Sequence, residues 1–343
     1  MDEYGVLLTY RSPIPGDGSG AQMQRILSIY IAAKANKIGY LHTPILDLGA
    51  NAGDSFSTTK EREEFLRLLN ELISLPSDRK FERVLVVQVD RIPLYLYSKL
   101  RFVNKVLKYF RYSLVIHIQQ VYNYIDTNPE NYERVMHFVR PRFKLSETPR
   151  NSLTIDCHIR RSTNPQFSRD GSINPRYTST SWFRNVVKEV RMALPPEFEL
   201  LIRIHTDGIP KQKLWTPPKE IADGTIEYWQ SLGVLNVSGD LILTSEDFPS
   251  QFQEFGNVEV IQDINPIEAW EMMISSDLLL IGKSSMSYIA GLIRGWRPVI
   301  YADFWHAGLA SWLEVEEELE LSSTTKQEVK AIVRSLVKEK SLD

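Results

Sequence analysis

The stretch SLTIDCHIRRSTNPQFSRDGSINPRY, residues 152–177, begins with the pattern of a buried strand. Every second residue is apolar, which is the period of a strand: Leu153, Ile155, Cys157 and Ile159. The sequence Ser162-Thr163-Asn164-Pro165 follows, and a proline cannot continue a hydrogen-bonded ladder. The pattern therefore predicts a strand over 153–160 that ends in a turn.

Three nitrogen-bearing side chains lie at the end of this predicted strand. His158 and Arg160 share one face, and Arg161 lies on the other. Ligands of open α/β sheets bind beyond the carboxyl ends of the strands. A guanidinium suits a phosphate or diphosphate there, because it offers a planar fork of donors and a permanent charge. The alternative is a structural cluster in which the arginines pair with Asp156 and Asp170.

Composition limits the class of protein. A chain of 343 residues favours two domains over one core. The net charge of −3 gives no reason to expect a nucleic-acid partner, and the single cysteine, Cys157, excludes a disulfide framework and a multi-cysteine zinc site. No apolar run approaches the roughly 18 residues of a membrane-spanning segment. The first residues carry no leader pattern, so we expect a cytoplasmic protein or, alternatively, the soluble portion of a secretory-pathway enzyme.

Predicted strands and helices alternate along the whole chain. The strands cover 6–10, 40–46, 83–89, 114–119, 153–160, 199–206, 258–264, 277–282 and 298–301. The helices cover 21–37, 59–75, 95–110, 128–140, 182–194, 266–276, 288–293 and 326–338. This alternation predicts the α/β class, with two doubly wound, Rossmann-like parallel sheets on either side of a cleft.

The polar segment 141–150, bounded by prolines, is the expected linker between the domains. We therefore expect an N-terminal domain over 1–145, a C-terminal domain over 150–320 and a C-terminal helix within 321–343.

One predicted strand and the helix after it differ in character. The strand RVLVVQV, 83–89, is apolar enough to be buried. The helix over 95–110 is amphipathic and basic, and we expect its cations to form a solvated face rather than a membrane or RNA surface: Lys99, Arg101, Lys105, Lys108 and the following Arg111.

A glycine-rich turn joins the first predicted strand to the first helix and contains Gly18 and Gly20. Backbone N–H groups at such a helix start can bind an anion or a sugar. The turn lacks the spacing of both common nucleotide-binding glycine motifs. A tight connection with no ligand is the alternative.

Two further strand ends of the second half carry polar residues. Asp207, after the strand at 199–206, can accept hydrogen bonds from a base or a ribose. Lys283, Ser284 and Ser285, after the strand at 277–282, can donate to phosphate. An ordinary turn or cap is the alternative for each of them. Parallel strands end at a shared edge, so we expect these groups near Arg160.

These motifs, taken in order, resemble those of one enzyme family. HIRR at 158–161 resembles the HxRRxD motif of α1,6- and α1,2-fucosyltransferases and protein O-fucosyltransferases. IHTD at 204–207 and SDLLLIGKSS at 276–285 are similar to the family's second and third motifs, and the glycine turn at 16–22 is similar to its N-terminal motif. The resemblance covers most of 151–300 and, more loosely, 5–45. Thr163 stands where the family has the acid of its first motif.

The resemblance implies a GT-B fold, in which two Rossmann-like domains face each other and the C-terminal one holds the nucleotide. It also implies an inverting, metal-independent transfer of fucose from GDP-fucose to a glycan acceptor, with no cofactor. The sequence contains no D-x-D triplet, which agrees with this expectation.

The resemblance also implies a role for each matching residue. Arg160 holds the diphosphate, and Arg161 supports it or the shape of the site. His158 and Asp207 approach the guanosine. Ser284 and Ser285 bind phosphate.

Alternatives remain open at this stage. The same fold can use another GDP- or UDP-sugar, or it can bind a nucleotide sugar or a glycan without turnover. The general base is not identified: the loop acids Asp17, Asp47, Asp54 and Asp170 could face the cleft, but each is better explained as an ordinary loop or cap residue.

Overall fold

The computed structural model describes residues 4–11, 18–48, 58–77, 83–127, 129–161, 176–206, 247–262, 264–317 and 320–342. The chain divides into two compact units. The first unit consists of Met1–Leu145, Ser285–Trp296 and Trp305–Ser311. The second unit consists of Ser146–Ser284, Arg297–Phe304 and Trp312–Asp343. Two short segments from late in the chain therefore belong to the first unit.

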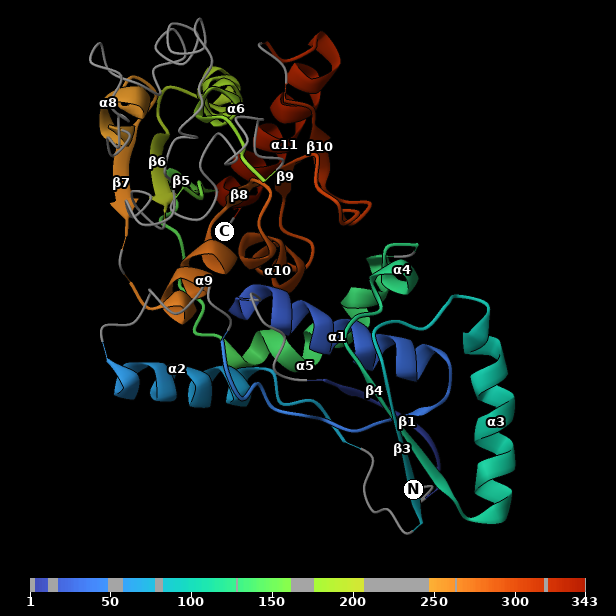
Figure 1. Cartoon of the computed structure of the whole chain (residues 1–343). Coiled ribbons are helices and arrows are strands. Elements are labelled where there is room, and N and C mark those ends of the chain that lie inside the picture. The colour runs from blue at the N-terminus through green and yellow to red at the C-terminus, as the bar shows by residue number, and fades with distance from the viewer. Residues whose placement is uncertain are drawn as a thin grey trace, which may run out of the picture. The chain divides into compact units, whose positions relative to one another are not determined.

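The first unit is built on a four-stranded parallel sheet with the strand order β2-β1-β4-β3 (Figure 1). Its strands are β1 (Gly5–Tyr10), β2 (Gly39–Tyr40), β3 (Val84–Val89) and β4 (Ser113–Ile118). Its helices are α1 (Ser19–Ala35), α2 (Thr59–Leu72), α3 (Leu96–Phe110), α4 (Tyr122–Ile125), α5 (Glu133–Val139) and α10 (Ser285–Arg294), with short 3-10 turns at Pro129–Tyr132 and Arg140–Arg142.

Two close approaches hold helices of the first unit in place. A Cβ on Gly20, in α1, would lie 2.7 Å from the backbone N and Cα of Met286, so α1 and α10 pack with their backbones in contact. Gly5 opens β1 with a positive φ of 125°, and a Cβ there would strike Asn104 of α3. The Asn104 side chain accepts a hydrogen bond from the Val6 N–H at 2.8 Å and donates one to the carbonyl of Lys37 at 3.1 Å. These bonds fix the side of α3 that faces the sheet.

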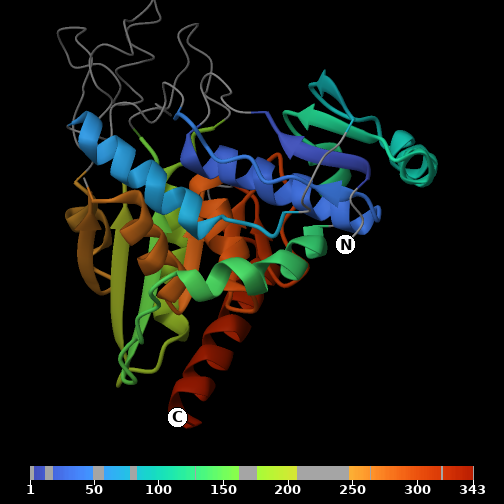
Figure 2. The same cartoon turned by 90° about the horizontal axis from the view of Figure 1, so that it is seen from below.

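The second unit is built on a six-stranded parallel sheet with the order β10-β9-β8-β5-β6-β7 (Figure 1; Figure 2 shows the same cartoon from below). Its strands are β5 (Ser152–His158), β6 (Glu199–His205), β7 (Asn257–Ile261), β8 (Leu278–Ile281), β9 (Val299–Ala302) and β10 (Leu313–Val315). Its helices are α6 (Thr180–Ala193), α8 (Phe248–Phe252), α9 (Pro266–Ser275) and α11 (Ser323–Leu342). This strand order is that of the Rossmann fold.

One face of the second sheet packs on α6 and α11 in a continuous apolar core. Ile155 and Cys157 of β5, Ile204 of β6 and Leu280 of β8 are fully buried in it. Trp182 of α6 adds a buried ring whose indole N–H donates to the carbonyl of Val315 at 3.1 Å, which ties α6 to β10. The opposite face carries the polar residues of the same strands.

The predicted α/β class with two Rossmann-like parallel sheets is confirmed. Among the described residues, no helix combines the length and the apolar character that crossing a membrane requires.

Some predicted elements differ from the structure. The strand expected over 40–46 stops at Tyr40, because the backbone N–H and carbonyl of Ile45 bond instead to the side chain of Asn70 in α2. The helix expected over 128–140 is a 3-10 turn followed by α5. Strand β10 and helix α8 are too short for periodicity to indicate them.

The prediction that the strand at 83–89 is buried is wrong. Strand β3 forms, but it is the edge strand of its sheet, and Leu85 and Val86 are 57% and 59% exposed. An apolar run indicates a strand and carries no information on whether a helix covers it.

Candidate functional site

The second sheet reverses its direction of winding between β5 and β8. The chain adds β6 and β7 on one side of β5, and then β8, β9 and β10 on the other. In open α/β sheets a ligand binds at such a switch point, beyond the carboxyl ends of the two strands. The residues that follow β5 are Ile159, Arg160 and Arg161, and those that follow β8 are Gly282, Lys283 and Ser284. The structure thus brings two of the three predicted motifs to neighbouring strand ends.

A buried charge network lies on the polar face of the sheet directly before this edge. Asp156 of β5 is fully buried, and its carboxylate accepts hydrogen bonds from Arg203 Nε at 2.7 Å and from His205 at 2.9 Å. Arg203 and His205 share this face because they are the partners of Asp156 and His158 in the β5–β6 register. Such a buried acid requires charged or hydrogen-bonding partners. Asp156 is therefore held by Arg203 and His205, and these bonds join strand β5 to strand β6.

The two histidines of this face lie next to each other at the end of their strands. His158 and His205 are register partners and are almost fully buried. The second ring nitrogen of His205, Nδ1, is buried and has no hydrogen-bond partner within the described ranges. The network fixes the His205 ring through its Nε2 and leaves Nδ1 to a ligand or to a residue outside those ranges.

The two arginines of the motif have different surroundings. Arg161 is buried, donates to the carbonyl of Thr178 at 3.1 Å and to the hydroxyl of Thr180 at 2.6 Å, and stacks on the Tyr177 ring at 4.6 Å. These contacts hold the start of α6. Arg160 is only partly buried. Arg161 is thus a structural arginine of this site, and Arg160 is the one with its side chain nearer to solvent.

Thr178 links the two strand ends, and sequence reasoning missed it. Its carbonyl accepts from Arg161, and its hydroxyl accepts from the backbone N–H of Lys283 at 3.2 Å. A Cβ on Gly282 would lie 2.9 Å from the same hydroxyl, so this glycine allows the loop after β8 to approach. The only sequence signal near Thr178 is the Ser179-Thr180 pair at the start of α6. Such a pair indicates a helix N-cap and does not indicate a tertiary contact.

The loop after β8 contains a further ion pair. Lys283 Nζ lies 2.5 Å from a carboxylate oxygen of Glu317, and the other oxygen of Glu317 accepts from the Ser179 N–H at 3.1 Å. Glu317 thus joins Lys283 to the residue that caps α6. Ser284 is buried, and Ser285 is the first residue of α10.

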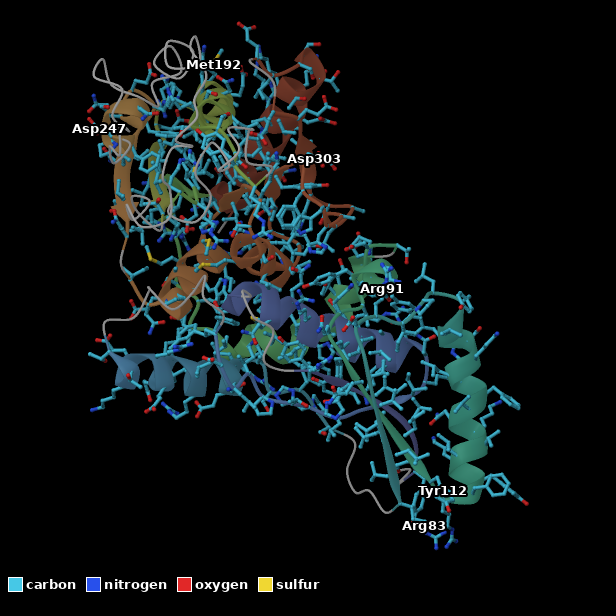
Figure 3. All side chains as sticks on the ribbon, viewed as in Figure 1. Arg83, Arg91, Tyr112, Met192, Asp247 and Asp303 are labelled. Carbon is cyan, nitrogen blue, oxygen red and sulfur yellow. The ribbon has the colours of Figure 1, made fainter. Side chains whose placement is uncertain are left out.

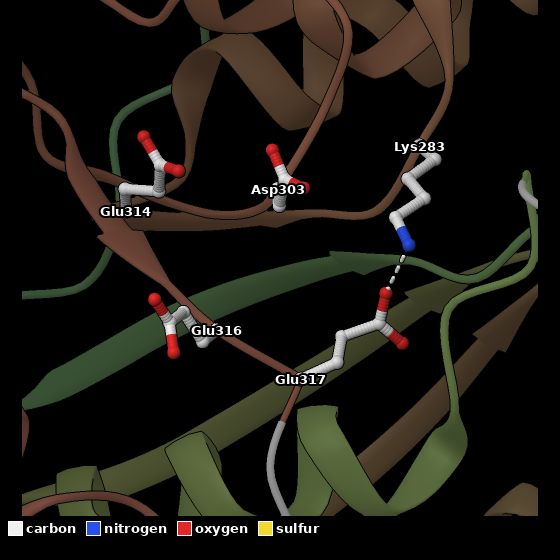
Figure 4. Close-up of a pocket in the computed structure, with 5 residues that line it drawn as sticks. All are labelled: Lys283, Asp303, Glu314, Glu316 and Glu317. Carbon is white, nitrogen blue, oxygen red and sulfur yellow. Dashed lines mark ion pairs between the residues drawn. The ribbon is translucent and has the colours of Figure 1, made fainter.

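A pocket of about 330 Å³ lies beside this ion pair, at the ends of β8, β9 and β10. Figure 4 shows its lining residues, which are Lys283, Asp303, Glu314, Glu316 and Glu317. The Tyr301 hydroxyl donates to Glu314, which orients one of the carboxylates. Carboxylates repel phosphate and accept hydrogen bonds from hydroxyls, so this pocket suits the hydroxyl groups of a sugar or ribose.

Three further predicted site residues do not belong to the described part of the second unit: Asp207, Gly18 and Gly20. Asp207 is outside the described residues. Gly18 and Gly20 belong to the first unit, at the start of α1. The close approach to Met286 accounts for Gly20, whereas a Cβ on Gly18 would meet open space.

The acids considered as general bases remain without assignment. Asp17, Asp54 and Asp170 lie outside the described residues. Asp47 accepts from the side chain of Arg62 and from the N–H of Leu48, which is the environment of a turn residue. Among the described residues, no group of three or more His, Cys, Asp or Glu side chains is placed to hold a metal ion.

The sequence matches no protein-family model and no curated protein. Among solved structures, it is similar to the E. coli heptosyltransferase WaaC with ADP, at 10% identity and a TM-score of 0.39, over 96% of this chain and 99% of that one. It is also similar to the E. coli ADP-heptose LPS heptosyltransferase II, at 12% identity and a TM-score of 0.37, over 98% and 99%. A third similar structure is a putative UDP-N-acetylglucosamine 2-epimerase from Listeria monocytogenes, at 10% identity and a TM-score of 0.33, over 99% of this chain and 89% of that one.

Proposed function

We propose that this chain is a glycosyltransferase of the GT-B type that transfers a sugar from a nucleotide sugar to an acceptor. The observation that carries the proposal is the meeting of the HIRR and GKSS segments at the switch point of a Rossmann sheet. In this proposal the second unit binds the nucleotide sugar, and the domain expected over 1–145 provides the acceptor side.

Arg160 is the proposed catalytic residue. Its guanidinium meets the diphosphate and stabilises the negative charge that grows on the leaving nucleotide as the glycosidic bond breaks. Arg161 acts as a positioning residue, because its donors are directed to Thr178 and Thr180 at the start of α6. Ser284 and Ser285 add hydrogen-bond donors from the neighbouring strand end.

The pocket beside Lys283 completes the proposed donor site. Its four carboxylates suit hydroxyl groups, and Lys283 supplies the one cation among its lining residues. A bound diphosphate competes with Glu317 for Lys283, so we expect ligand binding to exchange this ion pair.

GDP-fucose is the proposed donor, and a glycan is the proposed acceptor. The support for both is the resemblance of the motifs, with His158 and Asp207 near the guanosine. Because Thr163 replaces the family's acid, another GDP- or UDP-sugar is the first alternative, and binding without turnover is the second.

A ligand screen tests the proposal. A ligand that binds the native state raises its apparent stability by mass action. We expect GDP and GDP-fucose to raise the melting temperature more than ADP, UDP or CMP, with no change on adding EDTA. Stabilisation by UDP ligands instead would transfer the proposal to another donor. Nucleotide binding without sugar transfer or hydrolysis would indicate a binding protein. If no nucleotide raised the melting temperature, the proposal would be wrong.

Arg160→Ala tests the assignment of the catalytic residue. We expect it to weaken donor binding or turnover by about 2–4 kcal/mol, the range for the loss of a key charged donor. Arg160→Lys should restore only part of the loss, because lysine lacks the fork. Arg334→Ala on the exposed side of α11 makes the same change away from the site and should bind as the native chain does. Calorimetric titration with GDP measures the affinity of the three variants. An affinity of Arg160→Ala equal to that of the native chain would contradict the assignment.

A further inference from the structure

The outer side of helix α3 carries a line of exposed apolar residues. Tyr95, Phe102 and Tyr109 are 67%, 69% and 83% exposed. They are seven residues apart, which is about two helical turns, so they align along the helix over about 21 Å. Val106 lies one turn from Phe102 on the same side and is also exposed. We call these four residues the α3 stripe.

The stripe faces away from the body of the first unit because the opposite side of α3 is fixed. Asn104 is held between β1 and Lys37, and the Tyr97 ring is buried against the Tyr124 ring at a centroid distance of 4.6 Å. Arg101 adds two hydrogen bonds to the carbonyls of Ala35 and Asn36, at the end of α1. Rotation of the helix to bury the stripe would break these contacts.

Cations flank the stripe on both sides. Lys99 and Lys105 are exposed, and by helical position they lie on opposite edges of the stripe. The Lys99 ammonium lies 5.7 Å from the centre of the Tyr95 ring. Figure 3 labels Arg91 near the start of the helix and Arg83 with Tyr112 beyond its end, where the guanidinium of Arg83 lies 5.6 Å from the Tyr112 ring.

The charge of this region is opposite to that of the whole chain. Residues 91–125 contain six Lys and Arg residues and no Asp or Glu, whereas the full sequence has a net charge of −3. Anionic lipids attract such cations at a membrane surface. Tyrosine is suited to the same boundary, since its ring is apolar and its hydroxyl reaches water.

We propose that the α3 stripe, with Lys99 and Lys105, docks the chain on the surface of an anionic phospholipid bilayer. The helix would lie in the interface with its outer side toward the lipid, without crossing the bilayer. This differs from the sequence-based expectation of a solvated basic face, because that expectation did not include the exposure of Phe102 and Tyr109.

The same observations disfavour other occupants. A second copy of this chain would set one cationic helix against another, with like charges opposed. A nucleic acid would use the cations and stack on the aromatic rings, but it would leave the exposed aliphatic Val106 without a role. A bilayer accepts aliphatic, aromatic and cationic groups together.

Vesicle co-sedimentation of the full chain tests the proposal, and it does not depend on the sugar donor. We expect binding to mixed phosphatidylcholine and phosphatidylglycerol vesicles, little binding to phosphatidylcholine alone, and weakening by salt. Lys99→Gln with Lys105→Gln should weaken binding about 25-fold, from about fivefold for each cation. Phe102→Ser with Tyr109→Ser should weaken it more than about tenfold. Arg334→Gln with Lys338→Gln, the same charge change on α11, should have no effect.

A label tests whether the stripe itself meets the lipid. The one native cysteine, Cys157, is fully buried, and burial raises the pKa of its thiol, so a new surface cysteine is labelled selectively. An environment-sensitive dye on Phe102→Cys should shift its emission to the blue with anionic vesicles, and the same dye on Lys338→Cys should not.

Three results would overturn the proposal. They are no binding to anionic vesicles, equal loss in the α11 variant, and a dimer that the stripe variants abolish in the absence of lipid. Circular dichroism of each variant establishes that it remains folded, as expected for changes at exposed positions.

Discussion

Strands β8 and β3 have similar sequences and opposite surroundings. Both are short apolar runs in parallel sheets, LLLI in β8 and VLVVQV in β3. Every residue of β8 is buried between β5 and β9, whereas most of β3 is exposed. The difference comes from strand order and from helix placement, since β3 is an edge strand and the helix that follows it packs on β1. A strand's burial is thus decided by its neighbours and not by its own hydrophobicity.

The largest expected effect is at the buried charge of the second sheet. Asp156→Ala should lower the free energy of unfolding by about 3–5 kcal/mol, because it leaves the partly buried Arg203 without its carboxylate. Asp156→Asn should lose less, since an amide oxygen can still accept a hydrogen bond. Urea denaturation followed by circular dichroism measures both. Glu254→Ala removes the carboxylate of the exposed pair with Arg184 and should change little. Equal losses at the two acids would contradict the role given to burial.

Leu280→Ala in β8 should cost about 2–5 kcal/mol, the range for truncating a buried leucine in a core. The cavity would open between β8 and the helices α6 and α11. Denaturant titration gives the value, and a loss below about 1 kcal/mol would mean that this core is less closely packed than the structure indicates.

Gly20→Ala should cost about 1–3 kcal/mol, because the added methyl group meets the backbone of Met286, which cannot move aside as a side chain would. Gly18→Ser is the matched control. Its side chain enters open space, and serine is a favoured residue at a helix N-cap. Thermal unfolding of the two variants separates crowding from any general sensitivity of this turn.

The smallest effect is expected for Leu85→Ala in β3, within about 0.5 kcal/mol, because this leucine is already 57% exposed. Leu85→Ala and Leu280→Ala are the same substitution in the two different sheets, so they compare an exposed leucine with a buried one. A loss at Leu85 as large as that at Leu280 would show that β3 is covered in solution, either by a partner or by another part of the chain.

Much of the fold could be predicted from the sequence because its signals are local. The alternation of residues 153–159 indicates β5, and the three- and four-residue spacing in 21–37 indicates α1. The helix–strand alternation also indicates two parallel sheets. The shortening of β2 was not predictable, since it depends on Asn70, a residue 25 positions from Ile45.

The candidate site was predictable to the level of strand ends. The positions of His158, Arg160 and Lys283 at the carboxyl edge follow from periodicity and from the rule for parallel sheets. The difference between Arg160 and Arg161 does not, because it rests on contacts with Thr178 and Thr180 that only the folded chain creates. The joining of Lys283 to Glu317 is likewise a tertiary contact.

The division of the chain has a consequence for its synthesis. The first unit includes α10 and Trp305–Ser311, and the ring of His306 packs on Tyr122 at 4.4 Å while its Nδ1 lies 3.2 Å from Asp126. The first 145 residues therefore leave the ribosome without the segments that finish their packing. At translation rates of roughly 5–20 residues per second, the wait for residue 311 is on the order of ten to thirty seconds. During that interval α10 is absent, so the side of α1 that carries Gly20 stays uncovered. This exposed side makes the nascent N-terminal half a candidate client for chaperones.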